Sequence, residues 1–130
     1  MHKFNEKEII AIAALLVHAA KIDEIYSDHE KKIIINFIEN NMQDKSQSQK
    51  ILTEAEILEA DSNQLLNYTK IIKDGPAEIK KEIIEQLWKI LISDNSVDQY
   101  ESNLMRRICG LIYFSDKDSG EIRMRLSKNK

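Results

Sequence analysis

Helix-start signals recur along the whole chain, and they constrain its fold more than any other feature. In five of them, a Ser, Asp or Asn side chain can accept a hydrogen bond from an unpaired backbone N–H. A Glu or Gln three residues later can reach back and close a capping box. Two further starts are a proline suited to a first helical position and a serine ahead of an acidic run. The seven signals together predict about seven helices with short connections: Asn5–Glu8, Ser27–Glu30, Ser46–Gln49, Asp61–Gln64, Pro76, Asp98–Glu101 and Ser115.

Apolar residues follow the helical period between these starts, and strand-like alternation does not persist anywhere in the sequence. The segment Ile9–Ala20 is apolar on nearly all sides, which predicts a central helix packed by several neighbours. Residues 49–73 form two more polar amphipathic segments, around Leu52, Ile57 and Leu58 and around Leu65, Leu66, Ile71 and Ile72. Three glycines and one proline are too few for many tight turns. The predicted class is all-α, in one compact domain over residues 1–130.

Composition narrows the classes of partner. A net charge of −3 and the lack of interleaved aromatic and basic residues argue against nucleic-acid binding. The 12-residue run Ile9–Ala20 is too short to span a bilayer, and Glu6 and Glu8 precede it where a signal peptide would carry positive charge. The single cysteine, Cys109, cannot form an internal disulfide. We therefore expect a cytoplasmic protein without a membrane span.

A shift of 71 residues superimposes two similar blocks of the sequence. Asp23 then falls on Asp94, Ser27 on Asp98 and Glu30 on Glu101. Each block reads as an apolar helix, a short acidic turn, a cap and a second apolar helix, which is an αα-hairpin. We expect the two hairpins, at about 5–41 and 76–113, to form a pseudo-two-fold internal repeat, with helices at about 49–73 completing the bundle.

The repeated pattern, and above all "LWKILISDNSVDQYESNLMRRICGLIYFSDKD" (residues 87–118), resembles the TerB-like family of tellurite-resistance proteins. The resemblance covers nearly the whole chain, including the number of helices. It implies an all-helical bacterial stress-response protein in which acidic positions of the two turns form a metal site.

Most of the acids in the turns also have a structural explanation. Ser27 and Asp98 are good helix caps, while Glu30 and Glu101 complete capping boxes at the positive helix end. Asp23 and Asp94 are different, because each lies near the C-terminal end of the preceding helix, where negative charge is mildly unfavourable. These two could cap the following helix or share a cation with the glutamates.

The spacing of the acids limits which cation could bind. An EF-hand loop starting at Asp94 would have Gln99 at its sixth position, where glycine is required, and Met105 at its twelfth, where glutamate is required. No pair of histidines has zinc-ligand spacing, and neither His18 nor His29 has a recognisable nucleophile beside it. All-oxygen ligands favour a hard cation such as Ca²⁺, Mg²⁺ or Mn²⁺.

The sequence thus predicts a non-enzymatic binding module with one acidic face. The predicted metal ligands, which would bind a hard cation or a basic protein surface, are Asp23, Glu30, Asp94, Asp98 and Glu101. The alternative is a protein–protein interaction scaffold, for example a homodimer, in which Ser27, Glu30, Asp98 and Glu101 only cap helices.

Overall fold

Seven α-helices and one 3₁₀ turn make up the described part of the chain, which contains no strand. The computed structural model describes residues 4–22, 26–42, 44–61, 66–92 and 99–128. The all-α prediction is confirmed. The elements are α1 (Glu6–Ala20), α2 (Asp28–Asn40), η1 (Lys45–Gln47), α3 (Ser48–Asp61), α4 (Leu66–Lys73), α5 (Ala77–Ile92), α6 (Gln99–Ile112) and α7 (Asp116–Lys128).

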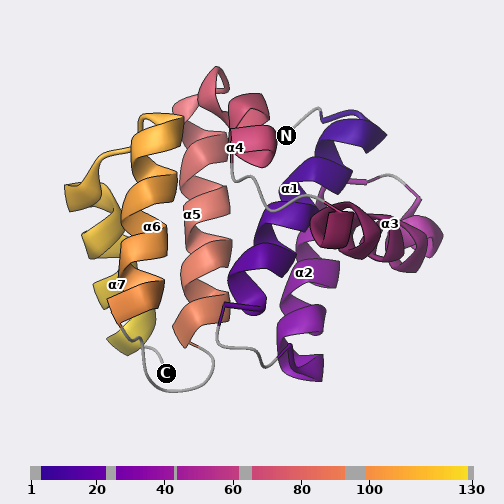
Figure 1. Ribbon diagram of the computed structural model, residues 1–130, viewed down its shortest axis with the longest axis horizontal. Helices are drawn as coiled ribbons and strands as arrows, with labels where there is room; N and C mark the ends of the chain where they lie inside the picture. The colour runs from indigo at the N-terminus through magenta and orange to yellow at the C-terminus, as the bar shows by residue number, and fades with distance from the viewer. Residues whose placement is uncertain (1–3, 23–25, 43, 62–65, 93–98, 129–130) are drawn as a thin grey trace.

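Helix α1 is the centre of the bundle. It packs against α2, α3, α4 and α5, and in Figure 1 it stands beside α5, with α3 running across it and α7 behind α6. This position explains why α1 is apolar all round, since neighbours cover every side. Its buried residues are Ile9, Ala11, Ile12, Ala13, Ala14, Leu15, Leu16, Val17, Ala19 and Ala20. Among the described helices, none is both long enough and apolar enough to cross a membrane.

Local capping chemistry sets three of the helix starts as predicted. The Asn5 side chain accepts from the Glu8 N–H at 2.8 Å, and Glu8 Oε1 accepts from the Asn5 N–H at 2.9 Å, which completes the box. Ser27 caps α2 in the same way. At α7, the Ser115 hydroxyl accepts from the N–H groups of Lys117 and Asp118. Each such cap contributes about 1 kcal/mol.

The helix pairs α1–α2 and α5–α6 occupy the two predicted hairpins, with helices of 15 and 13 residues in the first and 16 and 14 in the second. The pseudo-two-fold relation between them stays a prediction. Pro76 precedes α5 instead of occupying its first position, and its carbonyl accepts from the Ile79 and Lys80 N–H groups.

The segment around α3 differs from the prediction at three places. Asp44 caps the 3₁₀ turn η1, which takes the place of a helix start at Ser46. Asp61 is the last residue of α3, so it does not begin the next helix. Ile57 is 57% exposed and Leu58 is also exposed. The reason is that α3 packs against α1 and α2 through a different stripe of residues. That buried stripe is Ser48, Ile51, Leu52, Ala55 and Glu59.

Helix α6 ends in an unusual residue. Tyr113 adopts φ 60°, the only positive φ of a non-glycine residue in the described chain. The Phe114 N–H bonds to the Cys109 carbonyl at 2.9 Å, the bond that closes a Schellman motif. Glycine normally takes this left-handed position, and a tyrosine there costs about 1–2 kcal/mol.

Candidate functional site

Ser27 and Glu30 lie at the start of α2, directly after the first predicted turn. Glu30 Oε1 accepts from the Ser27 backbone N–H at 2.8 Å and from the Ser27 hydroxyl at 3.2 Å, while the Glu30 N–H donates to Ser27 Oγ at 3.2 Å. Glu30 is only 5% exposed. The capping role predicted for Ser27 and Glu30 is therefore confirmed.

The corresponding glutamate of the second turn is buried to the same degree. Glu101 lies in the first turn of α6 and is 4% exposed. A carboxylate is seldom so buried without compensating interactions. The other three predicted ligands, Asp23, Asp94 and Asp98, lie outside the described residues, so the metal set that they would complete stays a prediction.

Two carboxylates of α3 lie beside the first turn, and sequence reasoning missed both. The first is Glu59, which is 6% exposed. Lys21, the residue that follows α1, donates from Nζ to Glu59 Oε1 at 2.8 Å. His18 Nδ1 lies 3.2 Å from the other carboxylate oxygen. Together these contacts tie the C-terminal end of α1 to α3 and compensate the buried charge of Glu59.

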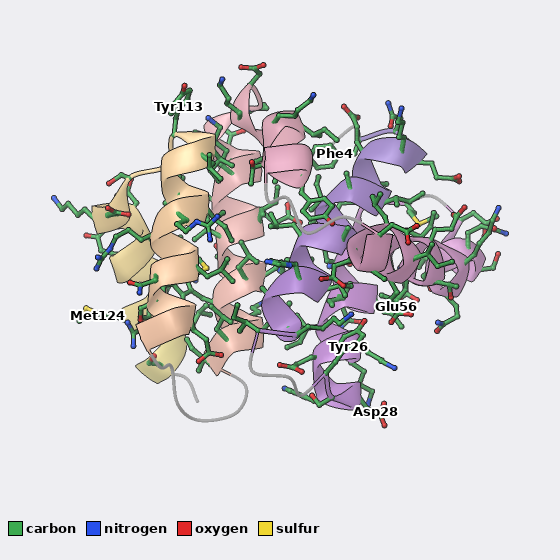
Figure 2. The ribbon with its side chains drawn as sticks, in the orientation of Figure 1. Phe4, Tyr26, Asp28, Glu56, Tyr113 and Met124 are labelled. Atoms are coloured by element: carbon green, nitrogen blue, oxygen red, sulfur yellow. The ribbon has the colours of Figure 1, made fainter. Side chains whose placement is uncertain are left out.

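Tyr26, on the other side of the turn, contacts the second carboxylate. Its hydroxyl donates to Glu56 Oε2 at 2.7 Å, and Figure 2 shows the two side chains meeting between the start of α2 and α3. The Lys31 ammonium lies 4.9 Å from the centre of the tyrosine ring, within cation–π range. Residues on both sides of the first turn are thus tied to α3, by Lys21–Glu59 before it and Tyr26–Glu56 after it.

The electrostatic environment of Tyr26 is strongly acidic. Burial is the main reason that the pKa of the Tyr26 hydroxyl lies well above its ordinary value, followed by the hydrogen bond to Glu56 and by the charges of Glu56, Glu30 and Glu59. Each cause disfavours a phenolate. Tyr26 therefore acts as a neutral hydrogen-bond donor, and the acids around it favour a cation over an anion near this turn.

We refer to Tyr26, Glu30, Glu56 and Glu59 as the first-turn cluster. Among the acids of this cluster that sequence reasoning missed, only Glu59 could have been suspected from the sequence. Glu59 lies four residues after Ala55 and seven after Leu52, so it occupies the apolar stripe of its own helix, where an acid needs a buried partner. No local pattern identifies Lys21 as that partner, because the two are 38 residues apart.

Within the described ranges, no group of three or more His, Cys, Asp or Glu side chains has an arrangement that could hold a metal ion. Glu56 and Glu59 already accept bonds from Tyr26, Lys21 and His18. A cation at the first turn would therefore need Asp23 as well, or would have to displace one of these donors.

Several other polar residues of the interior have structural contacts. His18 is partly buried and approaches Glu59. Trp88 belongs to the core and donates from Nε1 to Ser119 Oγ at 2.9 Å. Burial raises the pKa of the Cys109 thiol, against the opposing effect of a hydrogen bond with Ser119. These contacts join α5, α6 and α7 in the second half of the chain.

Comparison with known proteins identifies one related family. A family model described as "Tellurite resistance protein TerB" matches residues 9–124, which span α1 to α7. No curated protein and no solved structure matches the chain.

Proposed function

The chain belongs to the TerB family of tellurite resistance proteins, and on that premise we propose that it is a non-enzymatic binding module with one acidic face. The two repeated turns contribute this face, which takes a hard divalent cation or a basic protein surface. The setting that we propose is a bacterial cytoplasmic response to tellurite and related stress.

The observation that carries the proposal is the matched burial of Glu30 and Glu101. They are 71 positions apart, at the same place in the two predicted hairpins, and their exposures are 5% and 4%. Each is next in the sequence to a predicted acidic turn that also contains Asp23 or Asp94. Beside the first turn, Glu56 of α3 adds further negative charge, because its hydrogen-bond donor Tyr26 is neutral, and this charge favours a cationic ligand.

Calorimetric titration with Ca²⁺, Mg²⁺ and Mn²⁺ tests the cation form of the proposal. We expect binding in the unmodified protein and at least about tenfold weaker binding in Asp94→Asn, because a neutral amide loses the charge of the ligand. Asp61→Asn is the matched control, since it makes the same change at an exposed residue at the end of α3. If millimolar metal gives no heat, or if both variants weaken binding equally, the cation site is refuted.

A second candidate is a pure interaction scaffold whose acids only cap helices. The observation in its favour is that Glu30 Oε1 already accepts two bonds from Ser27. This alternative predicts that Asp94→Asn leaves partner binding intact and that Asp98→Ala mainly lowers the melting temperature. Tellurite tolerance of cells that carry either variant separates the two candidates, because only the binding module loses function with Asp94→Asn.

A further inference from the structure

A second surface lies in the other half of the molecule, away from the first-turn cluster. An open groove of about 490 Å³ runs between the N-terminal half of α5 and α7. Ile122 is buried and Phe114 is partly buried, so these two form its apolar base. Exposed charged residues of both helices surround that base: Glu78, Lys81, Asp118, Glu121 and Arg125.

The charges around this groove are not balanced. None of the carboxylates of Glu78, Asp118 and Glu121 forms an ion pair within the described part of the chain. Arg125 pairs at 3.2 Å with Glu85, so its charge is already neutralised. Lys81 opposes one of the three acids, and two negative charges remain in excess. The groove therefore favours a cationic occupant, and it disfavours nucleic acid or an anionic membrane surface.

Tyr113, which lies next to Phe114 of the groove in the chain, is independent evidence for a binding surface. It precedes Phe114 in the chain and is 71% exposed, and in Figure 2 its side chain projects from the end of α6 into solvent. The chain holds this aromatic residue in a left-handed conformation that glycine would adopt without strain. Residues held in strained backbone conformations cluster at functional sites, and tyrosine is enriched at binding hot spots.

The contacts of the Tyr113 ring indicate that it can bind a positively charged side chain. The Lys73 ammonium lies 5.3 Å from the ring centre, a cation–π contact, and yet most of the side chain is still open to solvent. An arginine or lysine of a partner can therefore stack on the remaining surface of the ring. The ring and the carboxylates thus favour the same class of partner.

We propose that the groove and Tyr113 form a docking site for a short basic amphipathic helix of a partner protein. An apolar side chain of that helix packs on Phe114 and Ile122, and flanking Lys or Arg side chains pair with Glu78, Asp118 and Glu121. Helices commonly bind in grooves between two helices through such apolar anchors. This surface is distinct from the acidic face proposed above.

The test uses two synthetic 14-residue peptides with leucines at helical spacing, one with lysine and one with glutamate at all other positions. Titration of the ¹⁵N-labelled protein followed by NMR reports which residues respond. We expect the lysine peptide to shift the signals of residues 77–81 and 113–125, and the glutamate peptide to shift none. Tyr113→Gly and Glu121→Lys should each weaken binding at least tenfold.

Two features keep this test decisive. Tyr113→Gly is compatible with the native backbone, so its helical circular dichroism should be unchanged. Asp61→Lys is the matched control for Glu121→Lys, because it introduces the same charge change at an exposed position of α3. This control should bind the lysine peptide as the unmodified protein does.

Three results would overturn the proposal. The first is equal binding of both peptides, or an equal loss in Asp61→Lys and Glu121→Lys. The second is a response confined to the first-turn cluster, which would place the basic peptide at the other acidic surface. The third is self-association of the protein alone in sedimentation velocity that Tyr113→Gly abolishes, since the occupant would then be a second copy of the chain.

Discussion

Replacing Tyr26 with phenylalanine isolates the hydrogen bond that ties the start of α2 to α3. The substitution removes only the hydroxyl that donates to Glu56 at 2.7 Å, and it keeps the ring that faces Lys31. Hydrogen bonds to charged acceptors contribute about 1.5–3 kcal/mol. Because Tyr26 and Glu56 are only half-buried, water can partly replace the lost donor, so we expect a loss of about 1 kcal/mol in the free energy of unfolding at pH 7.

The hydrogen bond between Tyr26 and Glu56 also makes the free energy of unfolding depend on pH above about 10. Burial and the neighbouring acids raise the pKa of Tyr26 in the folded protein, whereas in the unfolded chain it is about 10. The stabilising contribution of Tyr26 is therefore complete below pH 10 and is lost as the pH rises above it, because the unfolded chain releases its proton first. By pH 11 this loss is at most about 1.4 kcal/mol, and partial solvation reduces it to about 1 kcal/mol.

Urea unfolding followed by helical circular dichroism at pH 7 and pH 11 measures both effects. The unmodified protein should be more stable than Tyr26→Phe at pH 7, and the difference should shrink to nearly zero at pH 11. Tyr113→Phe is the matched control, since it removes the same hydroxyl from an exposed residue and should change stability by less than about 0.5 kcal/mol. If the two variants are equally stable at pH 7, or if the difference persists at pH 11, the reasoning is wrong.

Three further predictions concern other parts of the molecule. Ser27→Ala removes the cap of α2 and should cost about 1 kcal/mol, read as a lower urea midpoint with an unchanged slope. Leu16→Ala opens a cavity at the fully buried centre of α1 and should cost about 2–5 kcal/mol in the same measurement; a loss below about 1 kcal/mol would contradict the central position of α1. Cys109 is buried and its thiol pKa is raised, so a thiol-specific reagent should modify the native protein at least about tenfold more slowly than the protein in urea.

Much of the fold could be predicted because its causes are local. The caps at Asn5, Ser27 and Ser115 depend on residues two or three positions apart, and their spacing is visible in the sequence. The central position of α1 could be predicted in the same way, since a helix that is apolar on all sides can be stable only with neighbours on all sides.

The prediction failed where the orientation of a helix matters. The sequence places Ile57 with Leu52 and Leu58 among the apolar residues of an amphipathic segment, yet Ile57 is exposed. The packing of α3 against α1 and α2 decides which stripe is buried. Helical periodicity alone does not say how a helix is oriented against its neighbours. The left-handed Tyr113 is a similar case, since tyrosine at that position contradicts the usual residue preference.

The sequence by itself determined that this protein is an all-α member of its family, with two acidic segments and a glutamate, Glu30, that completes the cap of α2. Only the tertiary structure placed Glu56 and Glu59 beside the first turn and opened the groove between α5 and α7. The physical reason is separation along the chain. Caps and helical stripes arise from neighbours within a few residues, whereas Lys21 and Glu59 meet across 38 residues because the packing of whole helices brings them together.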